Sequence, residues 1–402
     1  MKITKVNVYL EKTPEGRPGW RPIFCRIYTD EGIWGDGEAA IAYGKGASAS
    51  FNMIKELAPM IIGMNPLQND VIWEKLYKGI FWGISGGPII FSAIAAIDMA
   101  LWDIKGKAYK APLHELLGGK YRDKLWTYAS QLQLGWGPHL KDQPGIDWGV
   151  DLQTYRDTAQ QAIEEGYTAV KVDFGSVSDK KVAVLSSLDT SALLRGELLD
   201  VIEARVAATR ETVGPNCAII MENHCAFDAP GAVQVAQRCE KYNIFYFEEG
   251  NAPTPATARY MRDKINIPLA QGERIFTRMQ YMPYFEDQSI QVIQPDIGNC
   301  GGITEVKKIC DMAYAYDVSV QAHTCASPLS TAVALHLEAA IPNFCIHEHH
   351  SNNLHAWNRM LCDVDLQPVN GYFDVPDAPG IGVSLTDYAL EKNVDCMVTI
   401  GK

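Results

Sequence analysis

Eight short apolar runs, separated mostly by helix-length amphipathic segments, constrain the fold of this chain more than any other feature. The runs are KLWTYAS, TAVKVDFG, CAIIMENH, IFYFEEG, IPLAQGER, IQVIQPD, VSVQAHT and FCIHEH. Strands that alternate with helices form parallel sheets, and eight such units close into a barrel. The pattern therefore predicts an α/β chain built around a (β/α)8 barrel, with a loop insertion over residues 176–196 between the second and third runs.

The residues before the barrel have a different pattern. Residues 1–40 alternate as two or three strands, and the stretch SAIAAIDMALWDIKGK has the apolar spacing of a helix. These features predict a small α+β domain over residues 1–120 and a barrel over residues 121–355. The remaining residues, 356–402, are rich in loop-forming sequence and are expected to complete the first domain by packing back on it.

Charge and cysteine usage exclude several classes of protein. The formal net charge of −12 argues against nucleic acid or an anionic membrane as a partner. The N-terminal stretch lacks the apolar core of a secretory signal, and no apolar run approaches the roughly 18 residues of a membrane span. The ten cysteines include no CxxC pair, which is typical of reduced thiols in the cytoplasm.

Seven of the eight runs, from the second onward, end in polar or ionisable residues. They are Lys171 and Asp173, Glu222 with His224, Glu248 with Glu249, Glu273, Asp296, His323 and Glu348. From Glu222 onward, one residue of each run follows the last by 26, 25, 23, 27 and 25 residues, which is close to one βα unit. A single Glu at a strand end is usually a solvated loop residue or a helix cap. Because the C-terminal ends of barrel strands meet at one face, where active sites form, the repeated spacing instead predicts one shared site.

Three carboxylates, Glu222, Glu248 and Glu273, follow successive strands and are expected to lie together. Packed carboxylates repel one another and take up protons unless a cation holds them ionised. Oxygen-only ligands suit a hard divalent ion, above all Mg²⁺, whereas no His/Cys cluster has the spacing of a zinc site. The sequence thus predicts a Mg²⁺ site. The neighbouring Glu249 is expected instead to pair with a Lys or Arg from an adjacent loop.

Asp296 and His323 close the sixth and seventh strands. A carboxylate one strand away can bind one imidazole nitrogen, fix the tautomer and raise the basicity of the ring. This pair predicts a general base that faces the metal. His224 lies two residues beyond Glu222, so strand alternation would point both the same way. His224 is interpreted as a second acid or base, with a supporting role beside the metal ligand as the alternative.

At these residues the chain resembles the enolase superfamily, and within it the mandelate racemase subgroup. The resemblance covers nearly the whole chain and includes SAIAAIDMALWDIKGK, PLHELLGG, FEE, GER, QPDIGNCGGITE, HTCASPLS and PGIGV. It implies a capping domain plus a modified TIM-type barrel, and abstraction of the proton α to a carboxylate, with Mg²⁺ stabilising the enediolate. It also implies the metal ligands named above, a His–Asp dyad at His323 and Asp296, and a catalytic Glu at Glu348.

Three departures from the subgroup pattern direct the functional prediction. Glu222 stands where most members have Asp, EEG replaces EEP, and the second strand reads Lys171-Val172-Asp173 in place of Lys-x-Lys. The missing second lysine weakens a two-base racemase and favours Lys171 and Asp173 as substrate contacts. The presence of His224 resembles the galactonate and mannonate dehydratases, in which one His removes the α-proton and another protonates the departing hydroxyl.

The sequence therefore predicts a Mg²⁺-dependent hydro-lyase that converts an aldonate to a 2-keto-3-deoxy acid. An epimerase, racemase or cycloisomerase on a related acid, and a catalytically silent sugar-acid-binding relative, are the alternatives. Trp20 and Arg21 in the loop PEGRPGWRP, and Trp82 in FWGISGG, are expected to contact the sugar acid; solvated loop residues are the competing interpretation. The substrate is expected to be the chain's small-molecule partner, and assembly into a symmetric homo-oligomer is expected from the fold.

Overall fold

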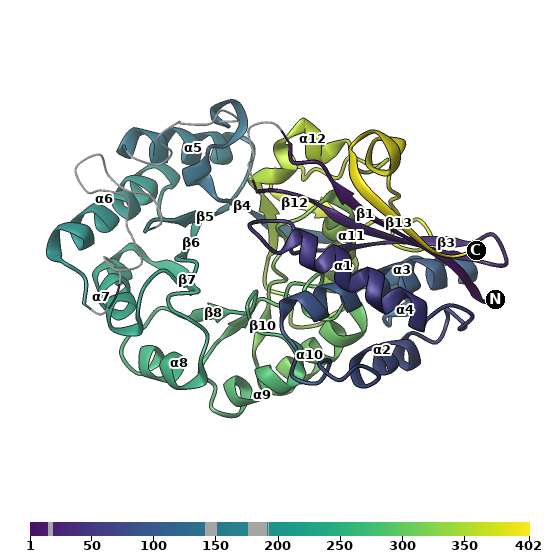
Figure 1. The fold of residues 1–402 in the computed structure, drawn as a ribbon. Helices are drawn as coiled ribbons and strands as arrows, with labels where there is room; N and C mark the ends of the chain where they lie inside the picture. The colour runs from purple at the N-terminus through teal and green to yellow at the C-terminus, as the bar shows by residue number, and fades with distance from the viewer. Residues whose placement is uncertain (15–18, 141–150, 176–190, 192) are drawn as a thin grey trace.

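The structure, a computed structural model, describes residues 1–14, 19–140, 151–175, 191 and 193–402. It contains a parallel barrel sheet surrounded by helices and a smaller antiparallel sheet packed beside it (Figure 1). The predicted insertion over residues 176–196 and the predicted capping loop over residues 14–22 fall partly outside these described residues. None of the helices in the described residues combines the length and the hydropathy that a membrane-spanning segment requires.

The barrel sheet has eight parallel strands, one in each of the eight apolar runs. These are β4 (Lys124–Ser130), β5 (Ala169–Asp173), β6 (Ala218–Glu222), β7 (Ile244–Glu248), β8 (Leu269–Gln271), β9 (Val292–Ile293), β10 (Ser319–Val320) and β11 (His347–His350). The hydrogen-bonded order is β10-β9-β8-β7-β6-β5-β4-β11. A parallel bridge between Val320 and Phe344, just before β11, joins the two ends of this order. The predicted barrel is confirmed.

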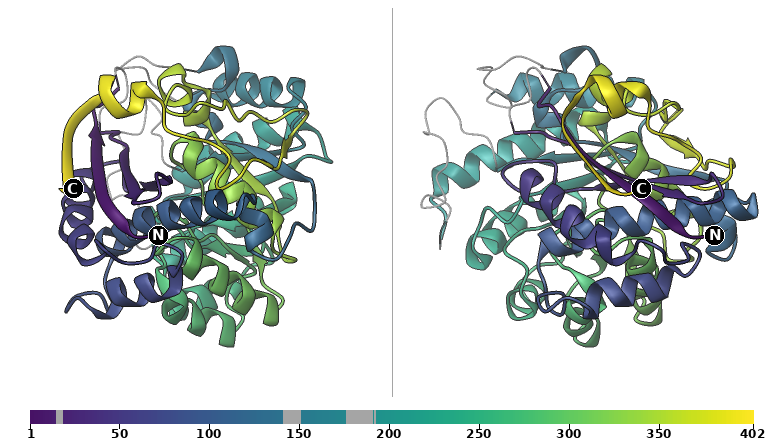
Figure 2. Two further views of the ribbon diagram at one scale, coloured as in Figure 1. Left: turned by 90° about the vertical axis from the view of Figure 1, so that its right-hand side faces the viewer. Right: turned by 45° about the vertical axis from the view of Figure 1, so that its right-hand side comes forward.

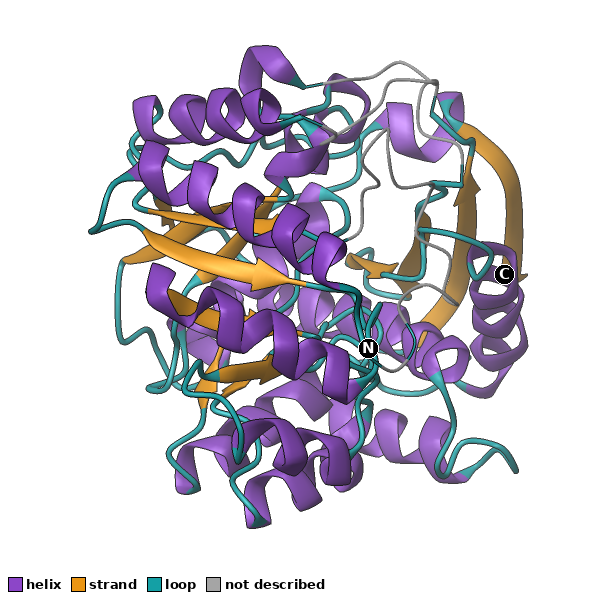
Figure 3. Ribbon diagram, turned by 90° about the vertical axis from the view of Figure 1, so that its left-hand side faces the viewer, coloured by secondary structure: helices purple, strands orange, loops and turns teal. Residues whose placement is uncertain are grey.

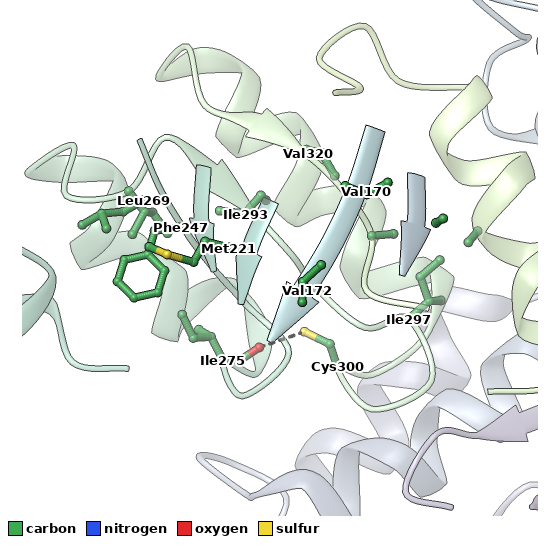
Figure 4. Packing of buried hydrophobic residues seen from close by; sticks show 14 of the residues in the cluster. Val170, Val172, Met221, Phe247, Leu269, Ile275, Ile293, Ile297, Cys300 and Val320 are labelled. Atoms are coloured by element: carbon green, nitrogen blue, oxygen red, sulfur yellow. Dashed lines mark hydrogen bonds between the residues drawn. The ribbon is translucent and has the colours of Figure 1, made fainter. Parts of the chain in front are cut away.

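Helices follow the strands and cover the outside of the barrel (Figure 3). They are α5 (Leu152–Glu164), α6 (Gly196–Val213), α7 (Ala229–Cys239), α8 (Pro255–Arg262), α9 (Thr277–Glu286), α10 (Ile303–Ala315) and α11 (Pro328–Ala339). Alternate strand residues point outward and pack against these helices in one apolar cluster that includes Val170, Val172, Met221 and Phe247 (Figure 4). The period of two along each strand leaves the intervening residues facing the barrel axis.

The smaller domain is an antiparallel sheet covered by helices. Its elements are β1 (Ile3–Glu11), β2 (Ile23–Thr29), β3 (Trp34–Ala39), α1 (Ala47–Leu57), α2 (Asn69–Lys78), α3 (Pro88–Tyr109) and, from the C-terminus, β13 (Val394–Gly401). The sheet order is β13-β1-β2-β3. Helix α3 lies directly on β3. The approach is so close that a Cβ at Gly35 or Gly37 would overlap backbone carbonyls of the helix. The predicted N-terminal strands and helix are confirmed.

The structure divides the C-terminal tail between the two domains. The short helix α12 (Ala356–Arg359) begins the tail after β11, the last barrel strand, whereas α4 (Leu113–Leu116) precedes the first barrel strand. Strand β12 (Tyr372–Asp374) then pairs antiparallel with β4 of the barrel. Only β13 joins the smaller sheet, where it lies beside β1 (Figure 2).

Buried carboxylates of the smaller domain hold it against the barrel. Glu38 at the end of β3 accepts hydrogen bonds from the Ser327 N–H at 3.1 Å and the Ser330 hydroxyl at 2.6 Å, at the start of α11. Asp98 in α3 accepts from the N–H and hydroxyl of Thr304, at 2.9 and 2.6 Å, at the start of α10. Helix N-termini carry unpaired N–H groups and partial positive charge. Since both helices begin where barrel strands end, these contacts hold the smaller domain on the C-terminal side of the barrel.

Candidate active site

The barrel interior is arranged in layers, and the upper layer is charged. A lower apolar layer contains, among others, Tyr128, Ala169, Ile220, Tyr246 and Ile346. Two residues further along the same strands lie Ser130, Lys171, Glu222, Glu248 and Glu348. Because side chains two residues apart share a face of a strand, all five of these residues point to the barrel axis. Strand periodicity thus places a ring of four ionisable side chains and one serine above the apolar layer, at the C-terminal mouth.

Lys171 is the centre of this ring. Its Nζ lies 2.8 Å from Glu222 Oε2, 2.7 Å from Glu248 Oε1 and 2.8 Å from Glu348 Oε1. Burial opposes the charged ammonium, but the three carboxylates outweigh it and raise the pKa of Lys171 well above its usual value. The same lysine and nearby imidazoles more than offset burial and hold the pKa of Glu348 well below its usual range.

The predicted metal ligands converge. Oxygen atoms of Glu222, Glu248 and Glu273 lie within 4.8 Å of one another. In the described structure, Glu222 Oε1 and Glu248 Oε2 are buried and have no hydrogen-bond partner, whereas the second oxygen of each carboxylate contacts Lys171. Burial and the neighbouring Glu222 raise the pKa of Glu248 to about 8, although Lys171 Nζ lies 2.7 Å away. A small oxygen-seeking cation such as Mg²⁺ fits these unpaired oxygens.

His323 lies beside this cluster and pairs with Asp296. Its Nδ1 is 2.7 Å from Asp296 Oδ2, and its Nε2 is 3.0 Å from Glu273 Oε2. Burial disfavours the charged ring, but Glu273 and the Asp296 hydrogen bond raise the pKa of His323 well above its usual value. Asp296 therefore orients the ring so that Nε2 faces the predicted metal ligands.

His224 forms a second imidazole–carboxylate pair. Its Nδ1 is 2.6 Å from Asp173 Oδ2, and its Nε2 is 3.8 Å from Glu222 Oε1. The partial burial of the ring is outweighed by Glu222 and the Asp173 hydrogen bond, which raise the pKa of His224 to about 10. The side chain is 39% exposed, so the ring is open to solvent on one side.

Comparisons with known proteins agree with the two-domain architecture. Residues 20–118 match the mandelate racemase / muconate lactonizing enzyme N-terminal domain, and residues 154–389 match the enolase C-terminal domain-like family. A D-galactonate dehydratase from Pectobacterium atrosepticum is 32% identical over 396 residues, which cover 96% of this chain and 93% of the relative. A D-xylonate dehydratase from Haloferax volcanii is 30% identical over 386 residues, which cover 94% of this chain and 86% of the relative. A solved member of the enolase superfamily from Salmonella Typhimurium is 46% identical, with a TM-score of 0.93 and 99% of both chains covered.

The chain belongs to the enolase superfamily. The resemblance to the mandelate racemase group that the sequence motifs indicated is therefore confirmed. Members of this superfamily bind a divalent metal, and the chain has a cluster of three carboxylates, Glu222, Glu248 and Glu273, at the barrel mouth. The assignment of individual residues to roles in this enolase-superfamily chain stays a prediction.

His224 lies beyond the end of its strand, so strand alternation does not determine where its side chain points. Strand β6 ends at Glu222, and His224 and Cys225 have φ values of 44° and 58°. This left-handed backbone turns His224 sideways toward Asp173, its neighbour from β5. Asp173, which the sequence predicts as a substrate contact, binds Nδ1 of His224. Its contact with the substrate stays a prediction. The expected partner of Glu249 is Arg274, which bridges Glu249 and Glu273.

The three capping-domain candidates are placed differently from the ring residues. Trp20 is 4% exposed, and its ring packs against Tyr43 and Trp357 with centroid distances of 6.4 and 6.1 Å. Arg21 forms an ion pair with Asp395 of β13. Trp82 is 74% exposed. Across the described part of the chain, no hydrogen bond, ion pair or ring contact joins these three candidates to the carboxylate ring.

Sequence reasoning missed the contribution of the first barrel strand. Ser130, at the end of β4, donates a hydrogen bond to Glu348 Oε1 at 2.7 Å. Gln131, the next residue, donates from Nε2 to Glu222 Oε2 at 2.9 Å. The signal for Ser130 was its position, because it closes the first run as polar or ionisable residues close the other seven. An uncharged side chain at a strand end does not by itself indicate a site.

Proposed function

We propose that this chain is a Mg²⁺-dependent acid-sugar dehydratase, a hydro-lyase that converts an aldonate to a 2-keto-3-deoxy sugar acid. The observation that carries the proposal is the pair of imidazole–carboxylate contacts on two sides of one carboxylate cluster. His323 Nε2 lies 3.0 Å from Glu273 Oε2, and His224 Nε2 lies 3.8 Å from Glu222 Oε1. Dehydration needs one group that takes a proton and another that gives one, and this arrangement offers both beside a single metal site.

His323 is the base of this proposal. Its Nε2 takes the proton from C2 of the substrate, and the C2–H bonding pair becomes the second bond of the enediolate. Asp296 holds Nδ1 at 2.7 Å and so fixes the direction of Nε2. Glu273, once it ligates a cation, would no longer favour the protonated ring, which leaves the lone pair of Nε2 free to take the proton. Positioned proton transfer of this kind contributes about 10²- to 10⁴-fold to a rate.

His224 is the acid. Its Nε2 gives a proton to the hydroxyl at C3 as the C3–O bond breaks, so that water leaves and a double bond forms between C2 and C3. The resulting enol then rearranges to the 2-keto acid. Asp173 holds the other ring nitrogen at 2.6 Å and stabilises the proton-carrying form of the ring.

Glu222, Glu248 and Glu273 would hold the divalent cation. The cation supplies electrostatic stabilisation to the substrate carboxylate oxygens as negative charge develops on them. Glu348 and Lys171 complete the proposed machinery: Lys171 holds Glu222, Glu248 and Glu348 in place through its three ion pairs. The Thr324 N–H donates to Glu348 Oε2 at 2.9 Å, which ties this carboxylate to the loop that carries His323.

The relatives and the second strand support dehydration over racemisation. Two relatives at 30% and 32% identity bear the names D-xylonate dehydratase and D-galactonate dehydratase. Asp173 occupies the position of the second lysine of the Lys-x-Lys motif, and its carboxylate is engaged with His224. A two-base exchange at C2 would lack that lysine. Trp20, Arg21 and Trp82 remain proposed contacts for the sugar chain. A cytoplasmic location and a homo-oligomeric assembly are also part of the proposal.

The proposal is tested by following two bonds separately. Purified protein is incubated with Mg²⁺ and a library of aldonates in D2O, and NMR measures exchange at C2 while a colour assay measures 2-keto product. His323→Asn should abolish both signals, whereas His224→Gln should abolish product and leave exchange. Full exchange in the His323 variant would sink the assignment of the base. Exchange in the wild type without any 2-keto product would indicate an epimerase, and Mg²⁺ binding with neither signal across the library would indicate a silent relative.

A further inference from the structure

Two glutamines after the first barrel strand form a chain of hydrogen bonds that ends on Glu222. The Asp173 N–H donates to Gln133 Oε1 at 3.1 Å, and Gln133 Nε2 donates to Gln131 Oε1. Gln131 Nε2 then donates to Glu222 Oε2 at 2.9 Å. Both glutamine side chains are buried, with exposures of 4% for Gln131 and 2% for Gln133. Neither residue belongs to the charged ring described above.

The two ends of the chain fix its direction. A peptide N–H, here that of Asp173, can only donate, and a carboxylate such as that of Glu222 can only accept. Each amide between them must therefore present its oxygen toward Asp173 and its NH2 group toward Glu222. This settles the orientation of both amides, which is otherwise ambiguous for glutamine. A reversed Gln131 would face Glu222 with oxygen against oxygen.

The backbone at Gln131 adopts an unfavourable conformation to make this contact. Its φ is 68°, in the left-handed region, which costs a residue other than glycine on the order of 1 kcal/mol. The Gln131 N–H nevertheless stays in the barrel ladder through a 3.0 Å hydrogen bond to the Lys171 carbonyl. The strand end is thus held in place while the side chain turns inward to Glu222.

The result is a carboxylate with one anchored and one free oxygen. Glu222 Oε2 accepts from Gln131 and contacts Lys171 Nζ at 2.8 Å. Oε1 is buried and has no hydrogen-bond partner among the described residues, with His224 Nε2 3.8 Å away. Glu has one more rotatable bond than the Asp that most members of the subgroup carry here, so it needs more restraint to present a defined oxygen. Two donors on Oε2 supply that restraint.

We propose that Gln131 positions Glu222 as a metal ligand, and that Gln133 acts through Gln131 by fixing the direction of its amide. The inference rests on the proposed function, because it requires the carboxylate cluster to hold a divalent cation. Both glutamines are positioning residues in this proposal, because each acts through another side chain. Removal of such supporting partners of metal ligands weakens metal binding by about 10- to 100-fold.

The test is titration of the full-length, substrate-free protein with MgCl2 by calorimetry. Gln131→Met keeps the volume and removes the donor, and it should raise the Kd of Mg²⁺ about tenfold or more. Gln133→Met should have a smaller effect, and the double variant should be no weaker than Gln131→Met alone. Gln294→Met is the matched control, because it breaks a 2.5 Å amide-to-amide hydrogen bond to Gln321 that leads to no metal ligand. Its Kd should stay within about twofold of wild type.

The outcomes separate this inference from the proposed function. Wild-type protein that binds no Mg²⁺ overturns both. Wild-type affinity in Gln131→Met, or an equal loss in the Gln294 control, overturns the positioning role alone. Additive losses in the double variant overturn the action of Gln133 through Gln131. Should Gln131→Met fail to fold by circular dichroism, Gln131→Asn withdraws the amide by one methylene and carries the same expected loss of affinity.

Discussion

Nδ1 of His224 lies 2.6 Å from Oδ2 of Asp173, across the gap between the third and second barrel strands. The same contact, at 2.7 Å, joins His323 to Asp296 between the seventh and sixth strands. Each imidazole therefore has its Nδ1 occupied and its Nε2 directed at the carboxylate ring. Two histidines on two sides of one ring can act as separate acid and base, and this division of labour can be tested without disturbing the metal ligands.

Asp173→Asn should slow water loss more than proton exchange. The amide keeps the shape of the contact with His224 but removes the charge that stabilises the protonated ring, so formation of 2-keto product should fall by about 10²-fold or more. Exchange at C2, which depends on His323, should stay within a few-fold of wild type. NMR exchange in D2O and a product assay on the same samples measure both. Equal losses of the two signals, with Mg²⁺ affinity intact, would contradict the assignment of His224 as the acid.

Lys171→Met should destabilise the fold, and Mg²⁺ should partly reverse this effect. The substitution leaves three buried carboxylates without their shared cation, which costs about 3–5 kcal/mol. Because a divalent ion bound at Glu222 and Glu248 replaces some of the lost charge, the urea midpoint of the variant should rise more with added MgCl2 than that of wild type. Urea unfolding with and without MgCl2 measures this difference.

Lys307→Met is the control for this prediction. Lys307 forms an ion pair with Asp311 at 2.6 Å on the surface of α10, one helical turn away. Removal of such a pair should cost below about 0.5 kcal/mol, with no dependence on Mg²⁺. An unfolding midpoint of Lys171→Met that does not respond to MgCl2 would show that the lysine and the cation do not share the same carboxylates.

The order of the strand ends was predictable from the sequence, whereas the turns beyond them were not. Glu222, Glu248 and Glu273 recur at the βα spacing, and parallel strands bring such positions to one face whatever the loops do. The position of His224 depends on a left-handed backbone at an ordinary residue, for which the sequence carries no glycine as a signal. The role of Gln131 is hidden for the same reason.

The pairing of the C-terminal strand β13 could not be predicted from the local sequence pattern either. Strand β13 pairs with β1, so that Lys5 lies opposite Gly401 at the far end of the chain. A strand with a partner this distant in sequence is specified by the packing of the whole domain. Local propensity supplies only a weak preference. The distribution of the tail between barrel and capping sheet therefore became visible only in the folded chain.

His336 should make the protein less stable in mild acid. Its Nε2 donates to the Ile381 carbonyl at 3.0 Å, and its Nδ1 accepts from the His114 N–H at 3.3 Å, so the ring is held neutral. Burial lowers the pKa of His336 from 6.5 to about 4. Below pH 6.5 His336 is protonated in the unfolded chain but stays neutral in the folded chain. The free energy of unfolding therefore falls between about pH 6.5 and pH 4. The loss reaches about 3 kcal/mol at most.

The comparison of two proteins isolates this contribution. Urea unfolding at pH 7 and pH 4.5 gives the loss of stability for wild type and for His336→Gln, whose amide can satisfy the same two partners without titrating. The variant should lose about 2 kcal/mol less over this range than wild type. Equal losses in both proteins would show that His336 is not the titrating group.

Glu38 should control how firmly the capping domain is attached to the barrel. Glu38→Met removes the acceptor for the Ser327 N–H and for the hydroxyls of Ser327 and Ser330, which leaves buried donors unpaired and costs about 2–3 kcal/mol. Hydrogen exchange should then accelerate in peptides from the start of α11 and from β3, because the loss is concentrated where the two domains meet. Ser330→Ala deletes only one donor and should cost about 1 kcal/mol or less. If the Glu38 variant exchanges like wild type at α11, the carboxylate does not fasten the domain, and the attachment depends instead on contacts such as that of Asp98 with Thr304.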